Sequence, residues 1–207
     1  MDGYANDGHC NAHRASGGRA IAPHRSWHNR PVDFARTFRD IETELACRQI
    51  RVAVVGGIAL AAYGHPRSTL DLDLVVDGDR QPQVIDVLAA QGFETLHQST
   101  GYSNHLHPDP TRGRVDVLYV RDRTRDSIFA GLRLLPGPGE APIPVPRPEH
   151  LIAMKVHAIR HAPARLWQDM ADIAHLVRLD GVDREEVRGY FVRAGLEDKW
   201  CELEAHL

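Results

Sequence analysis

Two aspartates, Asp71 and Asp73, stand at alternate positions in an otherwise apolar segment of this 207-residue chain. The alternation from Thr69 to Val76 predicts a β-strand. Successive side chains of a strand point to opposite faces, so both carboxylates share one face and lie roughly 6.6 Å apart along it. Carboxylate oxygens are the ligands that Mg²⁺ and other hard divalent cations take in proteins. The pair therefore predicts a site for one or two divalent cations.

Two glycines, Gly56 and Gly57, precede this strand. They end a short apolar run, Ile50–Val55, that predicts a buried strand, and they stand before a short helical segment, Ile58–Tyr63. Backbone N–H groups and the positive end of a helix dipole attract anions such as phosphate. A phosphate-binding turn followed by paired carboxylates is the arrangement that transfer of a nucleotidyl group needs.

A third carboxylate, Asp116, lies in the segment Arg114–Val120, whose alternating apolar residues predict another strand. Val115 and Val117 would occupy one face of that strand and Asp116 the other. A carboxylate in an apolar strand is costly unless it is paired or bound to a metal. Beside the first pair, Asp116 is a candidate metal ligand; without that pair it would be interpreted as a surface residue of an edge strand.

As a set, these residues resemble a known family. The Gly-Gly pair, the Tyr63-Gly64 dipeptide and the pattern Arg67-x-Thr69-x-Asp71-x-Asp73 are similar to the nucleotidyltransferase fold of the DNA polymerase β superfamily. More narrowly, they resemble the AbiEii-type toxin nucleotidyltransferases of bacterial type IV toxin–antitoxin systems, over about Phe34 to Val177. The resemblance implies an α+β fold, with a mixed β-sheet flanked by helices and a C-terminal helical part. It also implies that Asp116 completes the metal site.

Two residues of the C-terminal part belong to the same resemblance. Lys155, one of only two lysines, is followed by Gln168-Asp169-x-x-Asp172. In relatives, such a lysine and an aspartate of the pair border the nucleotide site, although Lys or Arg usually stands where this chain has Gln168. The alternative for Asp169 and Asp172 is a solvated helix face, and we expect Lys155 at the rim of an apolar helix face.

The pattern along the chain predicts three regions. Residues 1–31 are polar, without apolar periodicity, and predict a flexible tail. Residues 32–140 would form the nucleotidyltransferase core, in which 95–106 predict one weak strand and 126–135 a helical or turn segment. A Pro/Gly-rich connector leads to an all-helical part, residues 148–207.

Composition narrows the functional classes. The net charge of −3 gives no global case for nucleic-acid binding. No apolar run approaches the ~20 residues of a membrane span, so no membrane association is expected. Three cysteines without metal-like spacing are typical of reduced thiols, so we expect a cytoplasmic protein.

Together these features predict transfer of an NMP from an NTP to an acceptor hydroxyl, with Mg²⁺ or Mn²⁺ bound by Asp71, Asp73 and Asp116. The predicted nucleotide-binding residues are Gly56, Gly57, Arg67, Ser68, Thr69 and Asp169, and Lys155 is expected to act in catalysis. The resemblance favours an RNA acceptor such as a tRNA 3′ end, a toxin role and a cognate antitoxin. The alternatives are a small-molecule acceptor, as in aminoglycoside or lincosamide nucleotidyltransferases, and a non-catalytic module that binds a nucleotide or a partner. The run 147–165, with four fixed positive charges, would supply a modest RNA-binding patch.

Overall fold

The structure, a computed structural model, describes residues 31–207. The predicted tail, residues 1–31, lies outside the described residues except for its last position. The described part is an α+β fold built on one five-stranded sheet, as predicted.

The sheet has the strand order β1-β2-β5-β4-β3. Its central pair, β2 (Asp71–Asp77) and β5 (Arg114–Val120), is parallel, and every other neighbouring pair is antiparallel. The remaining strands are β1 (Val52–Val54), β3 (Glu94–Gln98) and β4 (Tyr102–Leu106). Because β2 and β5 are central and parallel, equivalent residues on them lie side by side with the same orientation.

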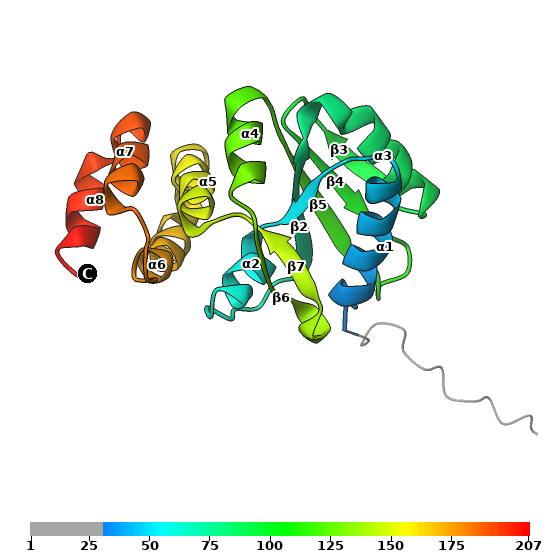
Figure 1. Cartoon of the computed structure of the whole chain (residues 1–207), viewed down its shortest axis with the longest axis horizontal. Coiled ribbons are helices and arrows are strands. Elements are labelled where there is room, and N and C mark those ends of the chain that lie inside the picture. Colours follow the sequence, from blue (N-terminus) through cyan, green and yellow to red (C-terminus); the bar gives the residue numbers. More distant parts are fainter. Residues whose placement is uncertain (1–30) are drawn as a thin grey trace, which may run out of the picture.

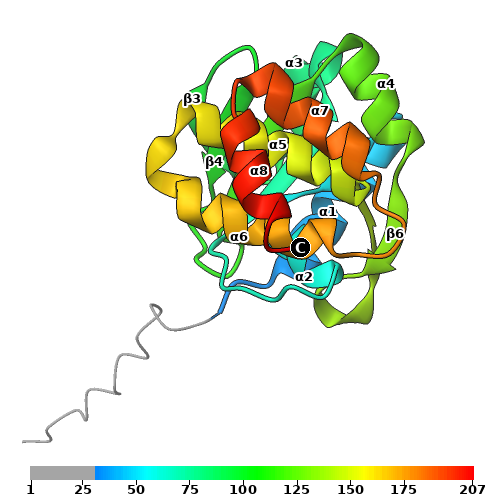
Figure 2. The same cartoon turned by 90° about the vertical axis from the view of Figure 1, so that its left-hand side faces the viewer.

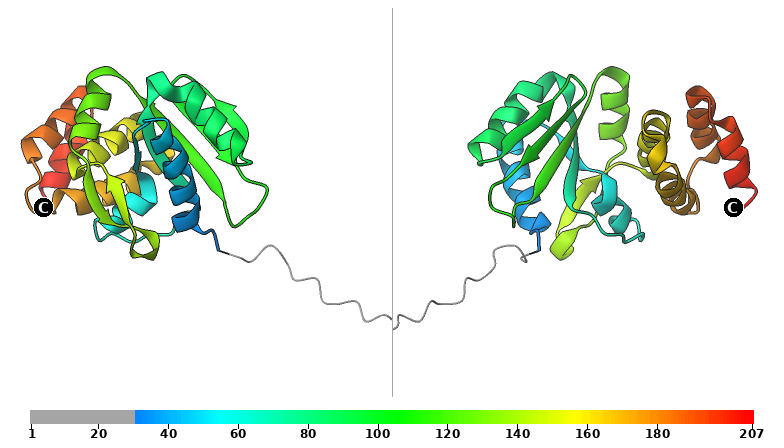
Figure 3. Two further views of the ribbon diagram at one scale, coloured as in Figure 1. Left: turned by 45° about the vertical axis from the view of Figure 1, so that its right-hand side comes forward. Right: turned by 180° about the vertical axis from the view of Figure 1, so that it is seen from behind.

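One face of the sheet carries the main hydrophobic core. Along β5, Val115 and Val117 are fully buried while Asp116 and Leu118 are only partly buried, which is the alternation expected of a strand with two different faces. Helices α1 (Phe34–Cys47) and α3 (Gln81–Ala90) lie on the buried side (Figure 1, Figure 3). Their apolar residues belong to the same buried cluster as the valines.

The other side of the sheet faces the C-terminal helices. The short helix α2 (Gly56–Ala62) follows β1, and α4 (Asp122–Ala130) follows β5. A hairpin of β6 (Arg133–Pro136) and β7 (Pro142–Val145) then leads to four further helices, which form the layer nearest the viewer in Figure 2. They are α5 (Pro148–His161), α6 (Leu166–Val177), α7 (Arg184–Ala194) and α8 (Glu197–Glu204). Buried residues of α5 and of the sheet belong to one continuous cluster, and the division into two domains stays a prediction.

Three predicted element boundaries were wrong. Residues 95–106 form two strands, because Ser99 begins a turn in which its backbone N–H donates to the carbonyl of Tyr102. Residues 126–135 contain the end of α4 and the start of β6. The helix after β1 begins at Gly56, two residues before the predicted Ile58. None of the helices in residues 31–207 has the length and apolar character needed to cross a bilayer.

Candidate active site

The three predicted metal ligands lie on one face of the central strand pair. In the parallel register Asp73 is opposite Asp116, and Asp71 is opposite Arg114. Residues opposite each other on neighbouring strands point to the same side of the sheet. The sheet therefore brings together the side chains that the sequence separates by more than forty positions.

Asp116 is held by three neighbours on its own side of the sheet. It accepts hydrogen bonds from Arg114 Nε at 2.8 Å, Asn104 Nδ2 at 2.7 Å and the Tyr102 hydroxyl at 3.0 Å. Both carboxylate oxygens are thus engaged. Among residues 31–207 no group of three or more His, Cys, Asp or Glu side chains is arranged to hold a metal ion. Arg114 supplies the positive charge that offsets Asp116, and the binding of a metal by the three carboxylates stays a prediction.

The negative charges around Asp73 are only partly offset by the positive charges of Arg67 and Arg165. Burial, followed by the charges of Asp116 and Asp71, raises the pKa of Asp73 to about 6. Burial and the charge of Asp116 also raise the pKa of Asp71. Carboxylates that repel one another in a partly buried site fit a hard divalent cation, because a cation removes both the repulsion and the desolvation cost. The oxygen-only donor set suits Mg²⁺ or Mn²⁺.

The glycine pair lets the chain pass directly over Asp73. Gly56 has φ +64°, and a Cβ built on it would lie 1.9 Å from Asp73 Oδ2. A Cβ on Gly57 would lie 2.8 Å from Cβ of Thr69. The backbone N–H of Val55 donates to the Asp73 carbonyl at 2.9 Å, which fixes the start of α2 against β2. Both glycines are therefore required for this approach of α2 to β2.

Lys155 lies in a buried ionic network, which corrects two expectations. It is 9% exposed, and its Nζ donates to Asp169 Oδ1 at 3.0 Å and to Asp172 Oδ2 at 2.5 Å. The two aspartates are 1% and 2% exposed, so the alternative of a solvated helix face was wrong. The expected place of Lys155 at the rim of an apolar face was also wrong, because α5 and α6 pack together with this charge between them.

The segment before β2 joins the same network. Arg67 Nε lies 3.5 Å from Asp172 Oδ2, and His65 Nε2 lies 3.3 Å from Asp172 Oδ1. Ser68 is exposed, and the Thr69 hydroxyl donates to the carbonyl of Asp71 at 3.1 Å. Of the predicted nucleotide-binding residues, Arg67 thus faces α6, while Ser68 and Thr69 shape the approach to the carboxylate strand.

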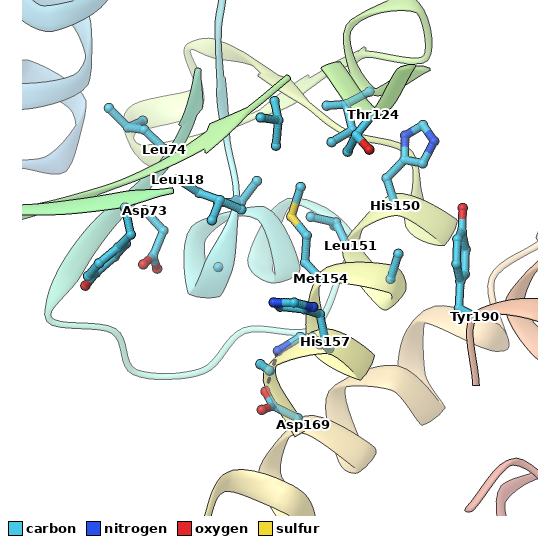
Figure 4. A pocket seen from close by; sticks show the side chains of 18 of the residues that line it. Asp73, Leu74, Leu118, Thr124, His150, Leu151, Met154, His157, Asp169 and Tyr190 are labelled. Atoms are coloured by element: carbon cyan, nitrogen blue, oxygen red, sulfur yellow. Dashed lines mark hydrogen bonds and ion pairs between the residues drawn. The ribbon is translucent and has the colours of Figure 1, made fainter. Parts of the chain in front are cut away.

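A pocket of about 820 Å³ lies between the sheet and the C-terminal helices. Its lining includes five predicted site residues: Gly56, Asp73, Asp116, Lys155 and Asp169. Figure 4 shows Asp73 at one end, Leu151 and Met154 in the middle, and Thr124 and His150 at the other end. The volume is within the range of pockets that hold small molecules and cofactors.

A family model described as uncharacterised nucleotidyltransferase matches residues 24–202. The chain belongs to this nucleotidyltransferase family. A comparison with curated protein sequences gives no match.

Solved structures share the fold of this nucleotidyltransferase. The antibiotic-resistance factor ANT(2'')-Ia aligns with a TM-score of 0.59 at 15% identity, over 83% of this chain and 95% of its own. The lincosamide antibiotic adenylyltransferase LnuA aligns with a TM-score of 0.52 at 14% identity, over 72% and 99%. An antigenic nucleotidyltransferase-like protein from Paracoccidioides brasiliensis gives 0.53 at 18% identity, over 85% and 94%. At these identities the likeness establishes the fold alone.

Sequence reasoning missed the residues that hold Asp116 in this nucleotidyltransferase. Arg114 could have been found, because it precedes Asp116 by two positions and a strand places both on one face. Tyr102 and Asn104 gave no such signal. They reach Asp116 only because β4 pairs with β5 in the register that sets Asn104 opposite it.

Proposed function

We propose that this nucleotidyltransferase moves an NMP from an NTP to an acceptor hydroxyl with the help of Mg²⁺ or Mn²⁺. The observation that supports it most is the register of β2 and β5, with Asp73 opposite Asp116 in a pocket that Gly56 also lines. Asp71, Asp73 and Asp116 would hold the metal, which supplies charge stabilisation for the triphosphate and for the entering and leaving oxygens.

The residues of the chain have separate roles in this proposal. Asp116, with its oxygens already aligned by Arg114 and Asn104, is placed to accept the proton of the acceptor hydroxyl. The hydroxyl oxygen then bonds to the α-phosphorus, the bond to the bridging oxygen breaks, and pyrophosphate leaves. Gly56 and Gly57 let backbone N–H groups approach the phosphates. Lys155 would position Asp169 at the pocket wall. Arg67 would stay beside α6 through its ion pair with Asp172, and Ser68 and Thr69 lead into the carboxylate strand.

The acceptor is proposed to be a small molecule. Of the four positive charges in 147–165, Arg147 lies 2.6 Å from Glu186 and Lys155 lies between two aspartates. Half of the predicted RNA-binding patch is therefore neutralised within the protein, which weakens electrostatic attraction for an RNA backbone. A small-molecule acceptor is also consistent with structural neighbours that include an antibiotic-resistance factor and a lincosamide antibiotic adenylyltransferase. An RNA acceptor in an AbiEii-type toxin with a cognate antitoxin is the second candidate, from the motif resemblance.

The test is incubation of the protein with each α-labelled NTP and Mg²⁺, once with total RNA and once with a panel of hydroxyl-bearing antibiotics. We expect label on a small molecule, dependence on the metal, and loss of transfer in Asp73→Asn. Label on RNA would replace the small-molecule acceptor with the RNA acceptor. Absence of transfer to every acceptor, together with NTP binding, would indicate a non-catalytic module.

A further inference from the structure

The two cations that the sequence suggests for the triphosphate are already paired within the protein. Lys155 Nζ donates to Asp169 and Asp172, and it is 9% exposed. Arg67 Nε lies 3.5 Å from Asp172 Oδ2, its Nη1 donates to the Ser68 carbonyl at 3.4 Å, and the residue is not part of the pocket wall. The charges of Lys155 and Arg67 are therefore largely offset by the two aspartates of α6.

Arg165 is a cation of the same region whose guanidinium is not held in this way. It ends a short 3₁₀ turn, η4 (Pro163–Arg165), and its side chain lines the pocket and is 55% exposed. Among residues 31–207, the carboxylate that it approaches within 4 Å is that of Asp169, with 3.8 Å between Arg165 Nε and Asp169 Oδ2. This distance is too long for a hydrogen bond. The backbone N–H of Arg165 donates to the Ala162 carbonyl at 3.0 Å, so the turn is fixed while the side chain keeps its donors for a ligand.

The charge of Arg165 acts on the carboxylate end of the pocket. Burial, followed by the charges of Asp116 and Asp71, raises the pKa of Asp73, and the charges of Arg67 and Arg165 act in the opposite direction. Asp73 and Arg165 also line the same pocket, one from the sheet and one from the helical layer. A triphosphate whose metal is held at Asp73 would therefore lie between the sheet and the Arg165 side chain.

Other basic side chains of the pocket wall do not meet this requirement. Arg123 belongs to α4, next to Thr124, which Figure 4 shows at the end of the pocket opposite Asp73. His157 also lines the pocket, but burial, followed by the charges of its neighbours on α5, lowers its pKa, so it is neutral at neutral pH. Arg165 thus combines a fixed charge, an exposed guanidinium and a place near Asp73.

We propose that Arg165 is a catalytic residue that binds the β- and γ-phosphates and stabilises the leaving pyrophosphate, while Lys155 holds α5 and α6 together. This inference rests on the proposed function. When the acceptor oxygen bonds to the α-phosphorus, the bond to the bridging oxygen breaks and its electron pair stays on pyrophosphate. The guanidinium keeps its protons and donates parallel hydrogen bonds to the phosphate oxygens that gain charge.

The test is isothermal titration calorimetry of the full chain with Mg²⁺-tripolyphosphate, with Mg²⁺-pyrophosphate and with Mn²⁺ alone. We expect Arg165→Ala to bind both polyphosphates about tenfold or more weakly than wild type, the scale of hydrogen bonds to charged groups. Mn²⁺ alone should bind at least as tightly as in wild type, because the variant lacks a positive charge that repels the cation. Arg165→Lys, which keeps the charge without the planar fork, should lie between Arg165→Ala and wild type.

Arg123→Ala is the matched control, because it removes an arginine from the other end of the same pocket. It should keep the wild-type affinity for both polyphosphates. Equal weakening in Arg123→Ala and Arg165→Ala would show a general effect of net charge and would overturn the assignment of Arg165.

The remaining outcomes separate this inference from the proposed function. Wild-type polyphosphate affinity in Arg165→Ala would overturn this inference alone. Equal losses of Mn²⁺ and polyphosphate affinity in Arg165→Ala would do the same, because they would indicate a purely structural role. Failure of the wild type to bind tripolyphosphate or any Mg²⁺-NTP would overturn the proposed function and this inference together.

Discussion

At the scale of single residues, the main property of the site is the free-energy cost of keeping the partly buried Asp73 carboxylate charged. Its carboxylate is partly buried beside two others, and Gly56 lies directly against its side chain. A charge held in such a place destabilises the fold unless a cation is bound. Function and stability therefore oppose each other at this position.

The first prediction concerns the pH dependence of stability in the metal-free protein. The pKa of Asp73 is about 6 in the folded state, against 3.8 for an unperturbed aspartate, so between these values the folded state keeps a proton that the unfolded state has lost. Stability contributed by this residue should fall as pH rises from about 4 to 6. Asp73→Asn removes that loss, and its free energy of unfolding relative to wild type should be higher at pH 7.5 than at pH 4.5 by on the order of 2 kcal/mol.

Urea unfolding at the two pH values, with EDTA present, measures this difference. Asp86→Asn, on the exposed side of α3, is the matched control and should track the wild type. This prediction is wrong if the free energy of unfolding changes by the same amount in Asp73→Asn and in wild type between the two pH values. The same Asp73→Asn protein should retain less than about one part in 10² of the transfer activity, since it loses an electrostatic contact to the metal.

At the scale of elements, α2 and β2 are joined by glycines, and α5 and α6 by a charge. In both places the identity of one or two residues decides whether the two elements can approach each other. The contact between α2 and β2 controls the position of Asp73. The contact between α5 and α6 controls the position of Asp169 and of the segment before β2.

The second prediction tests the contact between α2 and β2. Gly56→Ala places a methyl group within the van der Waals radius of the Asp73 carboxylate, in a backbone conformation with positive φ. We expect a loss of about 1–3 kcal/mol in the free energy of unfolding and a loss of transfer activity, because Asp73 must move. Gly64→Ala is the control, since Gly64 also has positive φ, +83°, but nothing lies within 4 Å of its added Cβ. Equal losses of activity in both variants would show that strain alone, and not the contact with Asp73, is responsible.

The third prediction tests the contact between α5 and α6. Lys155→Met leaves Asp169 and Asp172 buried without their shared cation, and removal of one partner from a buried ion network costs about 3–5 kcal/mol. Thermal unfolding should show a large fall in Tm. Adding Asp169→Asn and Asp172→Asn to Lys155→Met should recover much of it, because the unpaired charges are then gone. Lys199→Met, which removes the exposed lysine that pairs with Glu202, should leave Tm unchanged. A Tm of Lys155→Met equal to that of wild type would contradict the burial of this network.

At the scale of the whole molecule, the pocket lies between two layers that differ in construction. The sheet supplies Asp73 and Asp116, and helices α2, α4, α5, α6 and α7 supply the rest of the wall, including Asp169 (Figure 4). Under the proposed function a nucleotide in this pocket would touch both layers, so its binding would stabilise their packing as well as the site.

The fourth prediction is that Mg²⁺ and an NTP together raise Tm more than either alone. The metal relieves the repulsion around Asp73, and the nucleotide bridges the sheet and the helices, so each improves the binding of the other. At an NTP concentration of 100 times Kd the free energy of unfolding should rise by about 2.7 kcal/mol. Differential scanning fluorimetry with metal, nucleotide or both measures the shift. Asp71→Asn/Asp73→Asn should show no added effect of the pair, and an equal shift in that variant would place the nucleotide elsewhere.

The sequence alone determined much of the catalytic face. Alternation in β2 and β5 is a local property of a strand, so the shared face of Asp71 and Asp73, and the opposite orientations of Asp116 and Val117, followed from neighbouring residues. The requirement for glycine at the start of α2 was also visible, although its physical cause was not: a Cβ on Gly56 would lie 1.9 Å from Asp73 Oδ2. Family motifs then indicated the chemistry.

Tertiary structure alone decided how charged residues far apart in the chain are paired. Nothing near Lys155 in the sequence showed that α5 and α6 would close around it, and nothing near Asp116 showed that Tyr102 and Asn104 would hold it. The same holds for the contact of His150 with Ser127, which comes from another helix and lies 3.1 Å from its Nε2. Periodicity reports which face of an element is buried, but the partner of a buried charge depends on the register and packing of other elements, which are long-range properties of the fold.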